Sequence, residues 1–215
     1  MAFIKTTPAA EARDDVRAMY ARQEGSWGFV PNYAKVFCHR PELMTRWGKM
    51  LAEIKRYISP RHLEMATLAA ALELKHSACS LAHGNALAKI IGKDAVVAIA
   101  NGEEHEEITE AERAMINFAR RVAKDASSIT SGEVAALREV HGFSDAEIFD
   151  FAAIAASRSF FTKILDALGT EPDRSFMKLD KDLRQALTVG RPISWKEPER
   201  LEKLSAKVAG LFLRG

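Results

Sequence analysis

The sequence predicts an all-α protein, and three observations support this fold class. Apolar residues recur at helical spacing along most of the 215 residues. No stretch combines the alternating pattern of a β-strand with a hairpin turn. Three capping boxes stand ahead of apolar-periodic segments, each with a Glu three residues after the N-cap: Thr109 with Glu112, Thr130 with Glu133, and Ser144 with Glu147.

The first quarter of the chain is predicted to form three helices. Thr7 and Pro8 suit the N-cap and the first position of a helix. Residues 23–32 are rich in turn-forming residues and are predicted to form a loop. A short helix should follow and end near residue 39, because Pro41 disfavours helix in the residue before it and can itself open the next helix.

Two closely packed helices are predicted next. Ser59 suits an N-cap and Pro60 a first helical residue. Residues 63–74 are apolar on nearly every side, so this helix should be buried all round. A second helix should run over residues 77–91 and end at Gly92, a suitable residue after a helix terminus.

The chain is predicted to hold one main domain and an arm. Residues 1–170 contain the periodic segments and should form the helical domain. Residues 171–215 are more polar, contain three prolines and regain helical periodicity only from about Glu199. This C-terminal arm is expected to belong to the same domain or to pack on a neighbouring subunit.

Composition narrows the function classes. Hydrophobic residues at 47% and charged residues at 28% describe an ordinary soluble globular protein. A net charge of +2 gives no strong field, so nucleic acid is not an expected partner. No apolar run reaches transmembrane length and the start lacks a signal-peptide core, so a cytoplasmic protein without membrane contact is expected. Two cysteines are too few for a disulfide framework.

Residues 76–83 are the strongest candidate site. On a helix, His76, Cys79 and His83 can share one face, which favours thiol or metal chemistry. If Ser77 caps this helix, Cys79 occupies the second helical position, where the positive end of the dipole favours a thiolate. His83 can exchange a proton in the neutral range. Alternatively, Cys79 is a small buried hydrophobe.

A metal site is the less favoured interpretation of the same residues. His76, Cys79 and His83 suit Zn²⁺ or a softer metal, and Glu64 would complete four ligands. Three ligands from one helix are rare, however, so no metal is predicted. On one unbroken helix Glu64 would lie about 22 Å from Cys79. Joint action therefore needs a chain reversal within residues 72–77 or a Glu64 from a neighbouring subunit; alternatively, Glu64 is an ordinary first-turn acid.

The chain resembles a known family at this point. Glu64, eleven residues, then His76-x-x-Cys79-x-x-x-His83 is similar to the motif of the AhpD-like/carboxymuconolactone decarboxylase superfamily, which is Glu, eleven residues, Cys-x-x-Cys-x-x-x-His. Residues 28–32 and 41–43 resemble the N-terminal signature of its peroxidase-related branch. The later succession from residue 111 to residue 169 also agrees, so the resemblance covers roughly residues 10 to 175.

The resemblance implies an all-helical AhpD-like bundle that assembles into trimers or hexamers. Redox members of the family reduce hydroperoxides through a Cys pair, with a Glu and a His relaying a proton to the second Cys. Cys79 matches that second Cys, His83 the relay His and Glu64 the relay acid. His76 stands where the other Cys is expected, which excludes a disulfide within a Cys-x-x-Cys pair.

The leading hypothesis is an antioxidant peroxidase that works through Cys79 alone, with His83 and Glu64 as proton relay and with no cofactor. Cys79 would become a sulfenic acid and be reset by an external thiol or by Cys38, which is otherwise a core residue. His76 would then act as a second base or as a cation beside the thiol. The expected partners are a small hydroperoxide or other small substrate, a thiol reductant and further copies of the chain.

Two other hypotheses remain open from the sequence. One is a non-redox enzyme similar to the lactone decarboxylases, in which His83 and Glu64 do acid–base work and Cys79 only packs. The other is a non-catalytic helical oligomer, in which a thiol or metal site at His76, Cys79 and His83 controls assembly as a sensor.

Overall fold

The computed structural model describes residues 2–201, and these residues confirm the predicted all-α fold. They form ten α-helices and no strand. The helices are α1 (Asp14–Trp27), α2 (Asn32–Val36), α3 (Pro41–Ile54), α4 (Pro60–Glu73), α5 (Ser77–Ile91), α6 (Lys93–Asn101), α7 (Glu110–Asp125), α8 (Ser131–Glu139), α9 (Asp145–Ala167) and α10 (Lys181–Leu187). Short 3₁₀ helices lie at Ala9–Glu11, Phe37–His39, Ala126–Ser128 and Arg174–Lys178.

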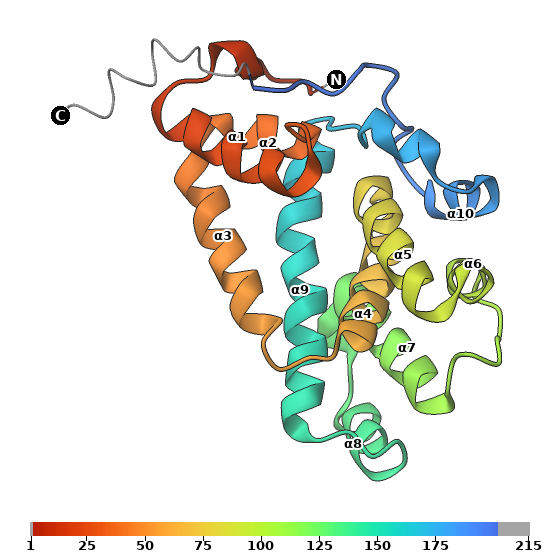
Figure 1. The fold of residues 1–215 in the computed structure, drawn as a ribbon. Helices are drawn as coiled ribbons and strands as arrows, with labels where there is room; N and C mark the ends of the chain where they lie inside the picture. Colours follow the sequence, from red (N-terminus) through yellow and green to blue (C-terminus); the bar gives the residue numbers. More distant parts are fainter. Residues whose placement is uncertain (1, 202–215) are drawn as a thin grey trace.

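Helix α9 runs the length of the molecule and organises the others (Figure 1). Helix α3 lies on one side of it, and α4, α5 and α7 lie on the other, while α1 and α2 cover one end (Figure 1). The helix predicted to be buried all round is α4, whose residues 65–71 are all fully buried. Helix α4 packs against α5, α7 and α9 at once, which explains its lack of a polar face.

The buried side chains form two cores, and α9 contributes to both. The large core is built by α4, α5, α6, α7 and α9 and includes Leu68, Leu87 and Phe151. The small core lies under α1 and α2 and includes Tyr20, Phe161 and Cys79. Because α5 places Leu81 in the large core and Cys79 in the small core, the predicted thiol lies at the seam between the two.

Several predicted helix ends are confirmed. Ser59 accepts a hydrogen bond from the backbone N–H of His62, and Pro60 is the first residue of α4. All three capping boxes are present, with the N-cap hydroxyl and the Glu at the third helical position bonded reciprocally. Helix α5 ends at Ile91, directly before Gly92, as predicted.

Two predictions about the N-terminal region are wrong. Pro8 precedes only one 3₁₀ turn, and α1 begins at Asp14. The segment before α1 is instead fixed by a side chain of α1, because the carbonyl of Thr7 accepts a hydrogen bond from the Tyr20 hydroxyl at 2.8 Å. The loop predicted over residues 23–32 is shorter, since α1 continues to Trp27, whose ring packs edge-on against Tyr33 and Phe176.

The arm contains a helix that the sequence analysis did not predict. Asp180 caps α10 by accepting from the N–H groups of Asp182 and Leu183, and Leu183 and Leu187 are buried against α5 and α6. The helical periodicity predicted from about Glu199 falls almost wholly on residues 202–215, outside the described residues. The division at residue 170 and a contact of the arm with a neighbouring subunit stay predictions.

Candidate active site

A left-handed residue between α4 and α5 brings the motif together. Lys75 has φ of 54°, and the His76 N–H donates to the Ala71 carbonyl across the turn. The chain therefore reverses within the predicted segment, and α5 packs back along α4. As a result, Glu64 and His83 of the same chain meet although eighteen residues separate them in sequence.

Helix α5 places Cys79 one position later than predicted. The N-cap is His76, so Cys79 is the third helical residue. The Ser77 hydroxyl does not cap the helix and instead accepts a hydrogen bond from the N–H of Gly190 in the arm, at 2.8 Å. Cys79 remains in the first turn, where the helix dipole favours its thiolate. Its side chain is buried, with 6% of the residue exposed.

His83 and Glu64 form a partly exposed pair. The Nδ1 of His83 lies 2.6 Å from the Oε2 of Glu64, and the two side chains are 18% and 15% exposed. The other ring nitrogen, Nε2, lies 3.4 Å from the Nη1 of Arg158. Because a guanidinium only donates hydrogen bonds, we assign the proton to Nδ1 and the lone pair to Nε2. This makes His83 a neutral imidazole.

The pKa of His83 agrees with that assignment. Burial lowers it, and the positive charge of Arg158 adds to the effect, together outweighing the opposing influence of Glu64. A neutral imidazole with a free Nε2 can accept a proton. His83 is therefore arranged as a base at neutral pH.

The pKa of His76 is shifted in the opposite direction from that of His83. It is buried, and its Nδ1 lies 3.0 Å from the Oδ2 of Asp166 on α9, outside the angles of a good hydrogen bond. Burial by itself lowers the pKa of His76, but Asp166 and the Cys79 sulfur outweigh it and raise the pKa to about 9. At neutral pH His76 is thus an imidazolium.

These neighbours favour the thiolate form of Cys79. Burial by itself raises the pKa of the thiol, but the interaction with His76 and its positive charge, with a further contribution from Arg158, lower it below the ordinary value. We call Glu64, His76, Cys79, His83, Arg158 and Asp166 the thiol cluster. It holds a buried thiol whose ionised form is favoured, an imidazolium and a neutral base.

Two residues of the thiol cluster, Arg158 and Asp166, are not predicted by the sequence motif. Arg158 lies on the same face of α9 as the buried residues Ile154, Phe161 and Leu165. A cation within this apolar stripe is the sequence signal that could have identified Arg158 as a site residue. Asp166 lies in the last turn of α9, where the helix dipole disfavours an acid. Neither residue is close to the motif in sequence.

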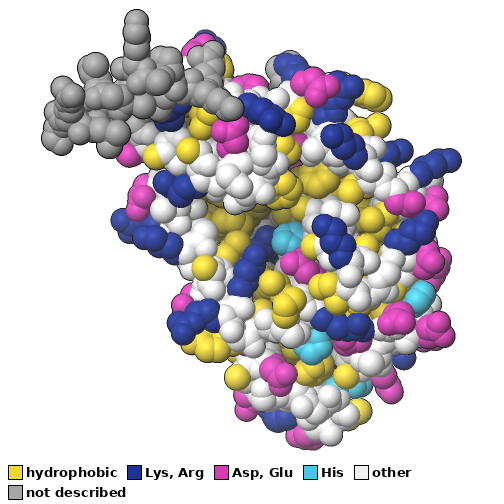
Figure 2. All heavy atoms as spheres, in the orientation of Figure 1, with side chains coloured by type: hydrophobic (Ala, Val, Ile, Leu, Met, Phe, Trp, Pro, Cys, Tyr) yellow, Lys and Arg dark blue, Asp and Glu magenta, His cyan; other side chains and the backbone are white. Residues whose placement is uncertain are grey.

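The thiol cluster opens to one face of the molecule. Figure 2 shows a hollow over α9, between α3 and α5, edged by hydrophobic side chains and with histidine, acidic and basic side chains inside it. A groove of about 550 Å³ between α3 and α9 borders the cluster through Trp47, whose ring lies 5.3 Å from the Arg158 guanidinium carbon. The groove is lined mainly by apolar side chains, among them Met50, Ile54 and Phe160.

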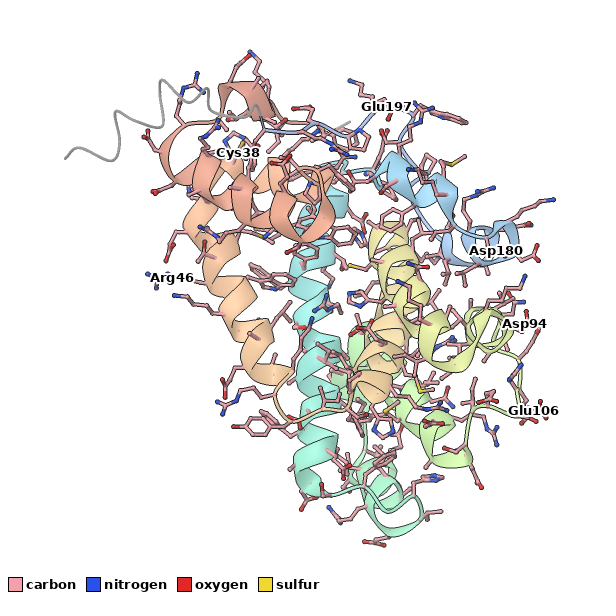
Figure 3. All side chains as sticks on the ribbon, viewed as in Figure 1. Cys38, Arg46, Asp94, Glu106, Asp180 and Glu197 are labelled. Carbon is pink, nitrogen blue, oxygen red and sulfur yellow. The ribbon has the colours of Figure 1, made fainter. Side chains whose placement is uncertain are left out.

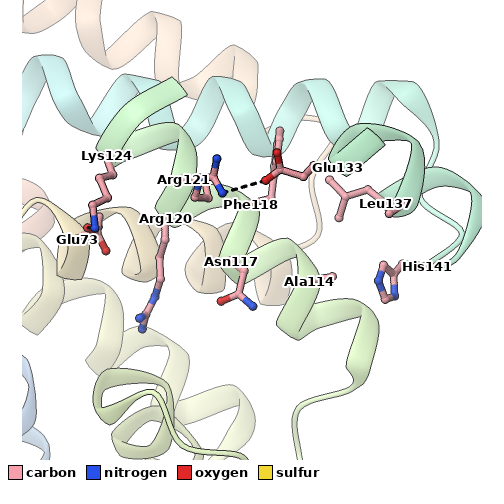
Figure 4. A pocket seen from close by; sticks show the side chains of 11 residues that line it. Glu73, Ala114, Asn117, Phe118, Arg120, Arg121, Lys124, Glu133, Leu137 and His141 are labelled. Atoms are coloured by element: carbon pink, nitrogen blue, oxygen red, sulfur yellow. Dashed lines mark ion pairs between the residues drawn. The ribbon is translucent and has the colours of Figure 1, made fainter. Parts of the chain in front are cut away.

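A second cavity, of about 420 Å³, lies between α7 and α8 (Figure 4). Arg121 pairs with Glu133 at 3.0 Å and Lys124 with Glu73 at 3.4 Å, and Nη2 of Arg120 donates to the Ile99 carbonyl at 2.7 Å. No cysteine lines it. This cavity therefore lacks the reactive groups found in the thiol cluster.

The structure also shows where Cys38 lies and whether the described residues could hold a metal ion. Cys38 is buried beneath α1 and α2 (Figure 3), where its sulfur accepts from the Thr7 N–H at 3.4 Å, and it belongs to the same small core as Cys79. Within residues 2–201 no three His, Cys, Asp or Glu side chains are grouped to hold a metal ion, and this includes His76, Cys79 and His83. No helix of these residues is long and apolar enough to cross a bilayer.

Comparisons with known proteins agree with the fold. No family model and no curated protein sequence matches the chain. Among solved structures, an uncharacterized peroxidase-related protein with an alkylhydroperoxidase AhpD core from Ralstonia eutropha is 25% identical, with a TM-score of 0.68 over 81% of this chain and 94% of that one. An uncharacterized peroxidase-related protein from Silicibacter is 19% identical, with a TM-score of 0.69 over 82% of this chain and 94% of that one.

The debrominase Bmp8 has the same fold. A cysteine-to-alanine variant of it, in complex with 2,3,4-tribromopyrrole, is 17% identical to this chain. Its TM-score is 0.63 over 86% of this chain and 97% of that one. The chain thus has the all-α AhpD-like fold, which confirms the predicted architecture.

Proposed function

We propose that this chain is a peroxidase-related member of the AhpD-like superfamily that reduces hydroperoxides through Cys79. The observation that carries the proposal is the pairing of a buried Cys79 with an imidazolium on one side and a neutral, carboxylate-bound imidazole in the next turn of the same helix. Only a thiolate attacks a hydroperoxide efficiently, and this arrangement favours the thiolate form of Cys79. The apolar groove beside Trp47 suits the organic part of a small hydroperoxide.

The oxidative half-reaction uses Cys79 and His76. The Cys79 thiolate attacks the terminal oxygen of the hydroperoxide, forming an S–O bond while the O–O bond breaks. The electron pair of the O–O bond leaves on the alkoxide, which takes a proton from the His76 imidazolium. The products are Cys79 sulfenic acid and an alcohol. His76, which replaces the family's other cysteine in the motif, thereby acquires a role as acid.

The reductive half-reaction uses His83 and Glu64. An external thiol gives its proton to Nε2 of His83 and attacks the sulfenic sulfur, and the hydroxide that leaves takes this proton to form water. The resulting mixed disulfide is resolved by a second external thiol, which releases the Cys79 thiol and a disulfide. Glu64 holds the imidazole in the required tautomer throughout. Assembly into trimers or hexamers is part of the proposal.

The test is hydroperoxide consumption by Cys79→Ser, with Cys38→Ser as the matched control. We expect Cys79→Ser to lose at least about 10³-fold in rate and Cys38→Ser to keep the wild-type rate with an external thiol. Full peroxidase activity in Cys79→Ser would overturn the proposal. Loss of turnover, but not of sulfenate formation, in Cys38→Ser would instead make Cys38 the resolving cysteine.

A non-redox reaction is the competing candidate, because a His83–Glu64 pair can also do acid–base work without the thiol. Alkylation of both cysteines separates the two: a peroxidase loses its activity, whereas a non-redox enzyme keeps its activity toward a carboxylated lactone. The likeness to debrominase Bmp8 adds 2,3,4-tribromopyrrole as a third substrate to include. Consumption of tribromopyrrole but of no hydroperoxide would replace the proposed reaction.

A further inference from the structure

Arg158 is a buried cation without an acidic partner. It is 3% exposed, and within residues 2–201 no carboxylate forms an ion pair with it. Its Nε and Nη2 atoms are buried and have no hydrogen-bond partner in the protein. Burying a guanidinium without a partner is costly, so a cation in this state indicates a group that meets negative charge during function. By contrast, Arg46 on α3 points away from the bundle (Figure 3).

The position of Arg158 is fixed on several sides. Its guanidinium carbon lies 5.3 Å from the centre of the Trp47 ring, and Trp47 stacks on Phe161 at 4.3 Å. Its Nη1 faces Nε2 of His83 at 3.4 Å. The guanidinium also interacts with the Cys79 sulfur, whose pKa it helps to lower. Arg158 therefore lies beside the base and acts electrostatically on the thiol, with the N–H groups of Nε and Nη2 unused.

We propose that Arg158 is a catalytic residue that stabilises negative charge as this charge moves from the Cys79 sulfur to the leaving oxygen of the hydroperoxide. This inference rests on the proposed function and adds a residue and a substrate class to it. In the resting site the guanidinium faces the thiolate. As the S–O bond forms and the O–O bond breaks, the sulfur becomes neutral and the charge appears on the alkoxide. The two unused N–H groups of Arg158 then bind that alkoxide until His76 protonates it.

The substrate class follows from this role. A strongly basic alkoxide needs the most stabilisation while it leaves, whereas a carboxylate leaves easily without help. Arg158 is thus useful for alkyl hydroperoxides and nearly dispensable for peracids. Since an arginine side chain stays protonated, it cannot replace His76 as the proton donor.

The experiment compares Arg158→Met with the wild type on hydroperoxides whose leaving groups differ in basicity. The rate of Cys79 sulfenate formation is measured in single turnovers with tert-butyl hydroperoxide, hydrogen peroxide and peracetic acid. Each variant is studied at a pH at which its own Cys79 is fully ionised, so that a changed thiol pKa does not contribute. Arg120→Met is the matched control, because Arg120 also has a buried, unpartnered Nε but lies at the remote cavity of Figure 4.

We expect Arg158→Met to slow the reaction with tert-butyl hydroperoxide by about 10²–10³-fold and that with peracetic acid by less than about tenfold. Arg120→Met should leave both rates unchanged. Equal slowing for all three oxidants in Arg158→Met, which a purely structural role predicts, would overturn the inference alone, and so would unchanged rates, which a purely pKa-setting role predicts. Absence of sulfenate in the wild type with every oxidant would overturn the proposed function and this inference with it.

A second variant covers the case in which Arg158→Met does not fold. Arg158→Lys keeps the charge but loses the planar fork of donors. We expect it to show the same dependence on leaving group in weaker form, with tert-butyl hydroperoxide slowed more than peracetic acid. Rates that fall equally for the two oxidants in Arg158→Lys would also contradict the inference.

Discussion

Two polar clusters share helix α4, and they differ in how completely their hydrogen bonds are satisfied. The first, which we call the capping cluster, consists of Arg61, Thr109 and Glu112. Glu112 is buried and accepts from Arg61 Nε at 2.5 Å, from Arg61 Nη2 at 3.1 Å and from the Thr109 N–H at 2.9 Å. Both carboxylate oxygens have donors. Burial by itself raises the pKa of Glu112, but Arg61 and Thr109 outweigh it and lower the pKa.

The thiol cluster lies one turn further along α4 and is incompletely satisfied. The Nε and Nη2 of Arg158 and the Nε2 of His76 are buried without a hydrogen-bond partner. Each such group costs about 1–3 kcal/mol of folding free energy. A cluster whose hydrogen bonds are all formed stabilises the fold. A cluster with unpaired donors can use them to bind a ligand or a transition state. We therefore expect mutations in the capping cluster to change mainly stability and mutations in the thiol cluster to change mainly activity.

The largest effect is expected from His83→Gln in the thiol cluster. A glutamine can still donate to Glu64 but cannot accept a proton, so the reset of Cys79 by an external thiol should slow by about 10²–10⁴-fold. Sulfenate formation should change much less, because His76 supplies that proton. Stopped-flow measurement of each half-reaction checks the expectation. A change in stability without a kinetic effect would show that His83 has a structural role, like the residues of the capping cluster.

The next largest effect is expected from Glu112→Ala in the capping cluster. This variant removes the carboxylate half of the capping box of α7, although the Thr109 hydroxyl can still accept from the N–H of residue 112, and it leaves Arg61, which is 31% exposed, without its carboxylate. We expect a loss of about 2–4 kcal/mol in the free energy of unfolding, measured with urea. At urea concentrations too low to unfold the variant, the rate of Cys79 oxidation should equal that of the wild type. A slower oxidation in the folded variant would show that the two clusters are coupled through α4.

The capping cluster was largely predictable from sequence, and the thiol cluster only in part. Thr109 and Glu112 are three residues apart, so their reciprocal bonds follow from local geometry. Cys79 and His83 lie one turn apart on one helix, so the motif predicted that they share a face. A reversal within residues 72–77 was one of two predicted alternatives, the other being a Glu64 from a neighbouring subunit. Its location at Lys75 depends on a left-handed conformation in a residue that rarely adopts it.

The remaining parts of the thiol cluster depend on tertiary packing. Asp166 and Arg158 come from α9, and no local pattern says which turn of α9 faces α5. The arm is a further example, because Leu187 packs against Gly84 and the Ser77 hydroxyl is taken by Gly190. The N-cap of α5 is His76, and not Ser77 as the sequence suggested. Charges that decide the protonation of His76 and His83 could therefore not be assigned from the motif alone.

The smallest effect concerns how the stability depends on pH. The folded pKa of His76, about 9, lies above its unfolded value of 6.5, so His76 alone would stabilise the fold below pH 6.5 and lose this contribution as pH rises through 9. The folded pKa of Cys79 is lowered, which gives a contribution that grows with pH below about 9. Between these limits the two contributions have opposite signs and partly cancel, so the pair gives the wild type a weaker pH dependence than His76 alone would give.

Cys79→Ser removes one side of that cancellation. Asp166 still favours the charged form of His76, so the stability of the variant should fall as pH rises from about 7 to 9, by at most about 1.4 kcal/mol per pH unit. Urea unfolding at a series of pH values measures the slope, and Cys38→Ser serves as the control with a wild-type profile. A flat profile in Cys79→Ser would show that Asp166 alone does not keep His76 charged, so that the imidazolium of the thiol cluster would depend on the ionised sulfur of Cys79.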